Sequence, residues 1–69
     1  MTTPVDEALG RAEELLGTLT AKREELERLA AAEDVDGDAA VDLIGELAEL
    51  ARQIEAELTR ARGLADAAG

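Results

Sequence analysis

The sequence predicts an all-α protein: an antiparallel two-helix hairpin of the coiled-coil kind that associates into a four-helix bundle. Three observations predict this fold. Ala, Leu, Glu, Arg and Lys occupy 44 of the 69 positions, a composition typical of long helices and coiled coils. Apolar residues recur with helical spacing in two long segments. Between these segments lies a short run of Asp and Gly, which is typical of a turn.

The first helix is expected over residues 4–33. Thr3 is suited to cap it, and Pro4 fits the first helical position because no N–H is needed there. Asp6 can complete a capping box with Thr3. When Val5 is set at heptad position a, apolar residues fill the a, d and e positions for nearly four heptads, so one face of this helix is predicted to be buried.

The turn is expected over residues 34–38, and the second helix over 39–65, with Ala40 at position a of a matching stripe. A short turn between long amphipathic helices makes them antiparallel neighbours. Residues 1–69 therefore form one hairpin domain. Folding the chain at Gly37 would align the two stripes layer by layer.

In that register, Leu26 is expected opposite Leu47, and Leu19 opposite Ile54.

Charged side chains within an apolar stripe can fix the register of the pairing, or can lay their stems along the edge and carry the charge to solvent. Both interpretations stay open for the three charged residues that interrupt the stripes: Lys22, Arg23 and Glu57.

The stripes, with their e positions, are wider than the seam between two helices, so Leu9, Leu16, Ile44 and Leu58 are expected to stay partly exposed. Covering four such side chains would supply several kcal/mol at roughly 25 cal/mol per Å². We therefore expect a homodimer or larger oligomer, or docking onto a larger helical protein. The residues expected to form these interfaces are Leu9, Leu15, Leu16, Leu19, Leu26, Leu43, Ile44, Leu47, Leu50, Ile54 and Leu58.

Three glycines fall at position f, opposite the main seam: Gly10, Gly17 and Gly45. Each glycine inside a helix costs about 1 kcal/mol relative to alanine. These glycines either form a groove that admits another helix, or are sequence variation on a solvated face.

The composition argues against an enzyme. The chain has no Cys, His, Ser or aromatic residue, which removes the usual nucleophiles, general bases and metal ligands. Carboxylates can do acid–base chemistry only in a pocket that perturbs their pKa values, and so short a chain offers little surface to build one. We expect no catalytic residues and no cofactor.

The charge argues against two classes of partner. The net charge is -10, whereas nucleic-acid binding depends on Lys and Arg displacing counterions from phosphate. Anionic membrane surfaces are disfavoured for the same reason. No apolar run is long enough for a transmembrane helix or a signal peptide. We therefore expect a cytoplasmic protein that binds neither nucleic acid nor membrane.

The acidic turn resembles the opening of an EF-hand calcium loop. Acids would fall at its first, third, fifth and ninth positions: Asp34, Asp36, Asp38 and Asp42. The sixth position is Ala39 where the loop needs Gly, and the twelfth is Gly45 where a bidentate Glu should bind. The alternative is an acid-rich helix start, since Asp near a helix N-terminus is favoured by capping and by the helix dipole.

A longer resemblance covers both helices. Val5–Leu19 and Asp38–Ala65 resemble the two helices of the small subunit of exodeoxyribonuclease VII. This resemblance implies a short acidic hairpin without catalytic residues that binds a large nuclease subunit. Two departures are Val5, where the family has an aromatic residue, and about eleven extra residues between the helices, or about three helical turns. The function classes are therefore an interaction module of this kind, a stand-alone structural oligomer and a calcium-binding hairpin.

Overall fold

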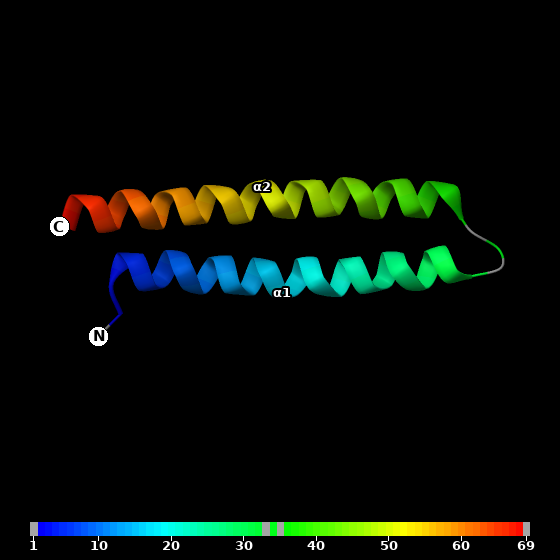
Figure 1. The fold of residues 1–69 in the computed structure, drawn as a ribbon, viewed down its shortest axis with the longest axis horizontal. Helices are drawn as coiled ribbons and strands as arrows, with labels where there is room; N and C mark the ends of the chain where they lie inside the picture. The colour runs from blue at the N-terminus through cyan, green and yellow to red at the C-terminus, as the bar shows by residue number, and fades with distance from the viewer. Residues whose placement is uncertain (1, 33, 35, 69) are drawn as a thin grey trace.

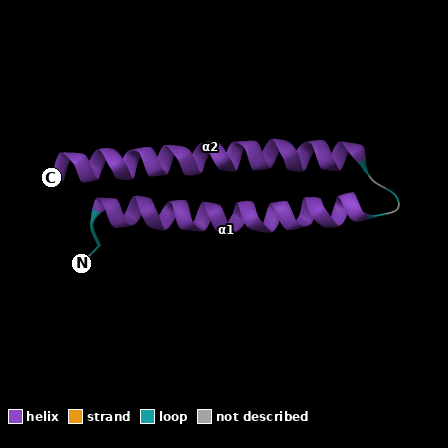
Figure 2. Ribbon diagram, viewed as in Figure 1, coloured by secondary structure: helices purple, strands orange, loops and turns teal. Residues whose placement is uncertain are grey.

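The computed structural model describes residues 2–32, 34 and 36–68. Helix α1 spans Pro4–Ala31 and helix α2 spans Gly37–Ala68. They lie antiparallel and side by side along a rod of 53 × 19 × 11 Å, and the described residues contain no strand (Figures 1 and 2). The all-α hairpin is therefore confirmed. Neither helix has an apolar stretch long enough to cross a bilayer, in the part of the chain that the structure describes.

Helix α1 begins with the predicted capping box. The Thr3 hydroxyl accepts a hydrogen bond from the Asp6 N–H at 3.1 Å, and the Thr3 N–H donates to the Asp6 carboxylate at 3.2 Å. The helix ends at Ala31, two residues before the predicted end. Ala32 follows in an extended conformation (φ -71°, ψ 146°), and its N–H donates to the Leu29 carbonyl. Residue 33 lies outside the described residues.

Helix α2 begins two residues earlier than predicted. Asp36 caps it, because its Oδ1 accepts hydrogen bonds from the N–H groups of Asp38 and Ala39 at 3.1 and 3.2 Å. The expectation that Gly37 lies within a turn at 34–38 is corrected, since Gly37 is the first residue of the helix. At the other end the helix continues to Ala68, past the predicted 65, as suits an alanine-rich segment of high helix propensity.

Two ion pairs between the helices show their register. Arg11 Nη1 lies 3.9 Å from Glu57 Oε1, and Lys22 Nζ lies 3.1 Å from Glu46 Oε2. In each pair the two residues are equally far along the chain from residue 34, so the connection is centred there and not at Gly37. The predicted alignment, with Leu26 opposite Leu47, is therefore wrong by about five residues, or about 7.5 Å at 1.5 Å per residue.

The buried core consists mostly of alanine. Four side chains are buried: Ala8, Ala12, Leu43 and Ala61. The other large apolar residues of the seam, such as Leu19 and Ile54, are half-buried. Among the described residues, no large side chain is fully buried. Small residues at a helix contact allow the helices to approach closely. The fully buried part of the seam therefore consists mostly of small side chains close to the backbone, and it encloses little side-chain volume.

The cap of α2 gives a direct test of the new helix boundary. Replacing Asp36 by Ala removes the acceptor of two N–H groups and should lower the free energy of unfolding by about 1 kcal/mol. Urea unfolding followed by circular dichroism measures it. Asp34→Ala, outside both helices, is the control and should change stability by under about 0.5 kcal/mol. Equal losses in both variants would show that Asp36 is not the cap.

The helical glycines give a second test. A Cβ atom added at Gly17 or Gly45 would meet no atom within 4 Å, and neither residue has a positive φ. Gly17→Ala and Gly45→Ala should each raise the free energy of unfolding by about 0.5–1 kcal/mol, with additive effects in the double variant. Thermal unfolding measures this change. A loss of stability at either position would instead indicate that another helix approaches that face closely.

Candidate functional site

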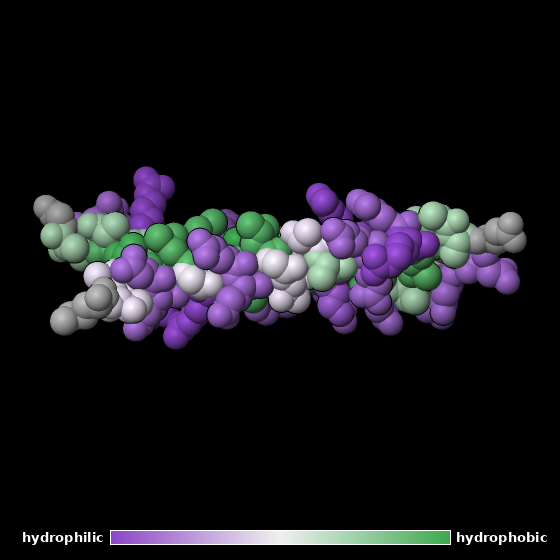
Figure 3. Space-filling view, turned by 90° about the horizontal axis from the view of Figure 1, so that it is seen from below, coloured by the Kyte–Doolittle hydropathy of each residue, from purple (hydrophilic) through white to green (hydrophobic). Residues whose placement is uncertain are grey.

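The candidate site is an exposed apolar surface. Five large apolar side chains are exposed, by 41 to 67%, and we call them the apolar face: Leu9, Leu16, Val41, Ile44 and Leu58. Three of them, Leu9, Leu16 and Leu58, line one shallow groove together with Ala12 and Ile54. Figure 3 shows hydrophobic side chains gathered along the half of the rod that carries the termini. Apolar side chains of both helices thus meet solvent in this groove.

The heptad pattern and the antiparallel arrangement place these residues on one side. Leu9 and Leu16 occupy e positions of α1, and Ile44 and Leu58 occupy e positions of α2. In an antiparallel pair the e positions of both helices flank the same side of the seam. Val41 lies at b, which is next to e around the helix. The shared groove of Leu9, Leu16 and Leu58 confirms this geometry for the half near the termini.

The structure divides the eleven predicted interface residues into two groups. Seven lie in the seam, where Leu43 is buried and the other six are half-buried: Leu15, Leu19, Leu26, Leu47, Leu50 and Ile54. The remaining four are the ones expected to stay exposed: Leu9, Leu16, Ile44 and Leu58. Val41, exposed by 67%, was not among the predicted residues. The sequence feature that could have identified Val41 is its position at b, which places an apolar side chain beside Ile44.

The surface area of the chain is large for its mass. The accessible surface is 5125 Å², whereas a monomeric globular protein of this mass exposes about 4,100 Å². The excess is about 1,000 Å², and one partner in a standard protein interface buries about 800 Å². The elongated shape, 53 × 19 × 11 Å, explains this excess, because two helices side by side leave most of their side chains outside the contact between them.

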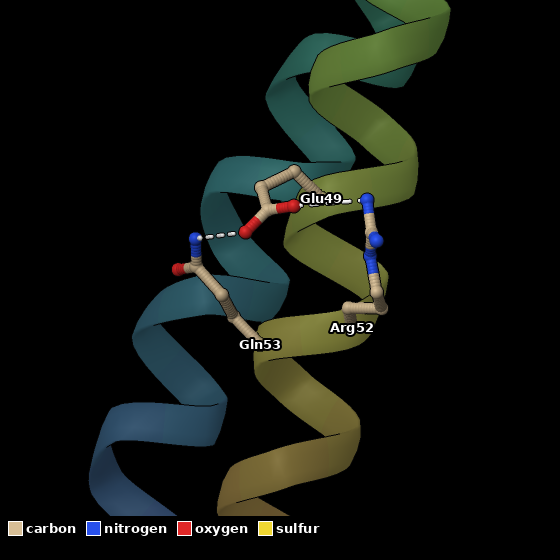
Figure 4. A network of polar contacts seen from close by, with 3 residues as sticks. All are labelled: Glu49, Arg52 and Gln53. Atoms are coloured by element: carbon tan, nitrogen blue, oxygen red, sulfur yellow. Dashed lines mark hydrogen bonds and ion pairs between the residues drawn. The ribbon is translucent and has the colours of Figure 1, made fainter.

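The other side of the hairpin is polar. It carries the two ion pairs between the helices. A hollow of about 540 Å³ near the turn is lined by charged side chains, among them Lys22, Arg28 and Glu46, and by apolar ones such as Leu29 and Leu43. Along α2, Glu49 lies between two partners (Figure 4): Arg52 Nη2 at 3.0 Å and Gln53 Nε2 at 3.4 Å. These groups are exposed and keep this side hydrated.

The charged residues that interrupt the stripes behave differently from one another. Lys22 and Glu57 each form an ion pair across the seam, which agrees with a role in fixing the register. Arg23 pairs within its own helix, with Nε 3.7 Å from Glu27 Oε1. The second oxygen of Glu57, Oε2, is buried and has no hydrogen-bond partner among the described residues. Glu57 is therefore an unfavourable feature of the seam.

The acidic side chains near the turn are not gathered into a cluster in the described part of the chain. No three acidic side chains come together to hold a metal ion within the described ranges, which include Asp34, Asp36, Asp38 and Asp42. The carboxylate of Asp36 accepts two N–H groups of α2. The Asp36 cap agrees with the alternative interpretation, an acid-rich helix start.

Comparison with protein-family models, with curated proteins and with solved structures finds no match to this chain. The resemblance to the nuclease small subunit stays a prediction.

Replacing Glu57 by Leu tests the energetics of the seam. The substitution removes a buried carboxylate oxygen that lacks a partner and adds apolar surface, so the free energy of unfolding should rise by about 1–3 kcal/mol. The lost pair with Arg11 counts for little because that guanidinium is mostly exposed. Urea unfolding measures the change, and Glu49→Leu on the polar side is the control. A less stable Glu57→Leu variant would contradict this assignment.

Proposed function

We propose that this chain is a non-catalytic protein interaction and oligomerisation module. Its apolar face packs against helices of another protein molecule and completes a core that two helices cannot enclose. The product is a four-helix bundle with another hairpin, or a complex with a larger helical protein. The observation that carries this proposal is the exposure of Leu9, Leu16, Val41, Ile44 and Leu58 on one side.

The energetics support a partner. Each of these side chains leaves roughly half of its surface in water, and covering them supplies several kcal/mol at about 25 cal/mol per Å². That amount is comparable to the whole stability expected of a small domain with a core of alanine. A chain built in this way is stabilised strongly by any partner that binds only its folded form.

The charge supports a protein as the partner. A net charge of -10 repels phosphate and anionic lipid headgroups. The exposed Glu and Asp residues of the polar side keep the free hairpin hydrated and discourage binding through that side. The resemblance to the nuclease small subunit adds one specific heterologous partner to this proposal, a large nuclease subunit.

Charge introduced into the apolar face tests the proposal. The double variant Leu16→Glu with Leu58→Glu should abolish association, because two carboxylates per chain would enter an apolar contact. The wild-type melting temperature should rise with protein concentration over a roughly hundredfold range, and that of the variant should not. Analytical ultracentrifugation gives the mass of each species.

The matched control adds the same two charges at exposed positions away from the face, with Ala21→Glu and Ala56→Glu. This control should associate like the wild type. Affinity purification from the native host uses the same three proteins, and a partner that the control retains and the face variant loses supports the proposal. A chain that is monomeric at every concentration, with no partner that distinguishes the variants, contradicts it.

A further inference from the structure

The composition of the apolar face favours a second copy of this chain as its occupant. The e and b positions of both helices, which form and border the face, carry two cations and four acids: Arg23, Arg62, Asp6, Glu13, Glu27 and Glu55. Their net charge is -2, so -8 of the total of -10 lies elsewhere. Two such faces repel each other weakly.

Two arrangements of a symmetric pair bring the faces together with all neighbouring helices antiparallel. In one, the two turns lie at the same end, and α1 packs on α2 of the second copy. In the other, the turns lie at opposite ends, and each helix packs on its own counterpart. The register set by the Arg11–Glu57 and Lys22–Glu46 pairs decides which residues meet in each case.

The orientation with both turns at the same end would bring like charges together inside the interface. In the observed register, Glu13 and Glu55 are equally far from the turn, so Glu13 of each copy would meet Glu55 of the other. Asp6 would meet Arg62 of the other copy in the same way, at the exposed end of the rod, where an ion pair adds little. Glu13 also lines the shallow groove that Leu9, Leu16 and Leu58 form. The two carboxylates would therefore be desolvated between Leu9, Leu16 and Leu58, where like charges cost several kcal/mol.

Turns at opposite ends remove that clash. A two-fold axis through the middle of the rod passes near Ala51, and this places Leu58 level with Ile44 of the second copy. Arg23 then lies within one helical turn of the second copy's Glu13. The one pair of like charges, Asp6 with the second copy's Glu27, falls at the exposed ends of the rod, where solvent and salt screen it.

We propose that two copies of this chain pack apolar face to apolar face with their turns at opposite ends. Leu58 of each copy contacts Ile44 of the other, and Arg23 of each pairs with Glu13 of the other. This inference rests on the proposed function, since it takes the apolar face as the binding surface and names its occupant and orientation.

The distance between the two turns tests the orientation. The chain has no Cys, so Ala31→Cys at the exposed end of α1 accepts a single nitroxide label. Opposite turns place the labels about 42 Å apart along the rod, at 1.5 Å per residue. Turns at the same end place them under about 30 Å apart, given neighbouring helices 8–10 Å apart. Double electron–electron resonance on the purified dimer should give the longer distance, and the shorter one would overturn the proposed orientation.

Charge exchange tests the pairing. Glu13→Arg and Arg23→Glu should each weaken dimerisation by roughly tenfold, since each places like charges at two symmetric sites. The double variant should restore wild-type affinity. Glu14→Arg makes the same change in net charge on the polar side and should not weaken the dimer. Additive losses in the double variant would overturn the Arg23–Glu13 contact.

The outcomes separate this inference from the proposed function. A dimer with a short label distance overturns only the orientation. A strict monomer that still captures a host protein through Leu16 and Leu58 overturns the second copy as the occupant and leaves the proposed function standing. A strict monomer with no partner that depends on this face overturns both.

Discussion

The limited width of the seam between α1 and α2 is the constraint on which the other features of this protein depend, because two helices alone cannot enclose the whole of their apolar stripes. Ala8, Ala12 and Ala61 are buried, and they form most of the buried core. A contact between small side chains brings two helices close together but encloses little apolar volume. The large side chains at the e positions lie outside the contact because the stripes are wider than the seam. The same seam that joins the hairpin therefore produces the exposed apolar face.

The seam also explains why the chain exposes more surface than its mass predicts. An unfolded chain of this mass exposes about 10,400 Å², so the 5125 Å² of the hairpin means that about half is buried. A globular domain of similar size buries about 60%. The apolar face and the high surface area have one cause: two helices alone do not enclose a complete core. Covering the apolar face, as in the proposed association, would reduce this exposed surface.

Polar groups contribute alignment more than stability. The pairs of Arg11 with Glu57 and of Lys22 with Glu46 bridge the helices on the polar side. Ion pairs this exposed stabilise by at most about 1 kcal/mol, yet they disfavour shifted registers that would separate the charges. Glu57 combines an alignment role with a buried oxygen that lacks a partner. Register in this hairpin is thus fixed at some cost in stability.

The sequence by itself determined the two helices, the Thr3 cap and the four exposed residues Leu9, Leu16, Ile44 and Leu58. These features depend on hydrogen bonds between residues three or four apart and on the width of a repeating stripe, both of which are local. Only the tertiary structure decided the register, the exposure of Val41 and the ion pair of Glu57. Register depends on where the connection is centred and on how residues far apart in the chain pack, and no local pattern contains that information.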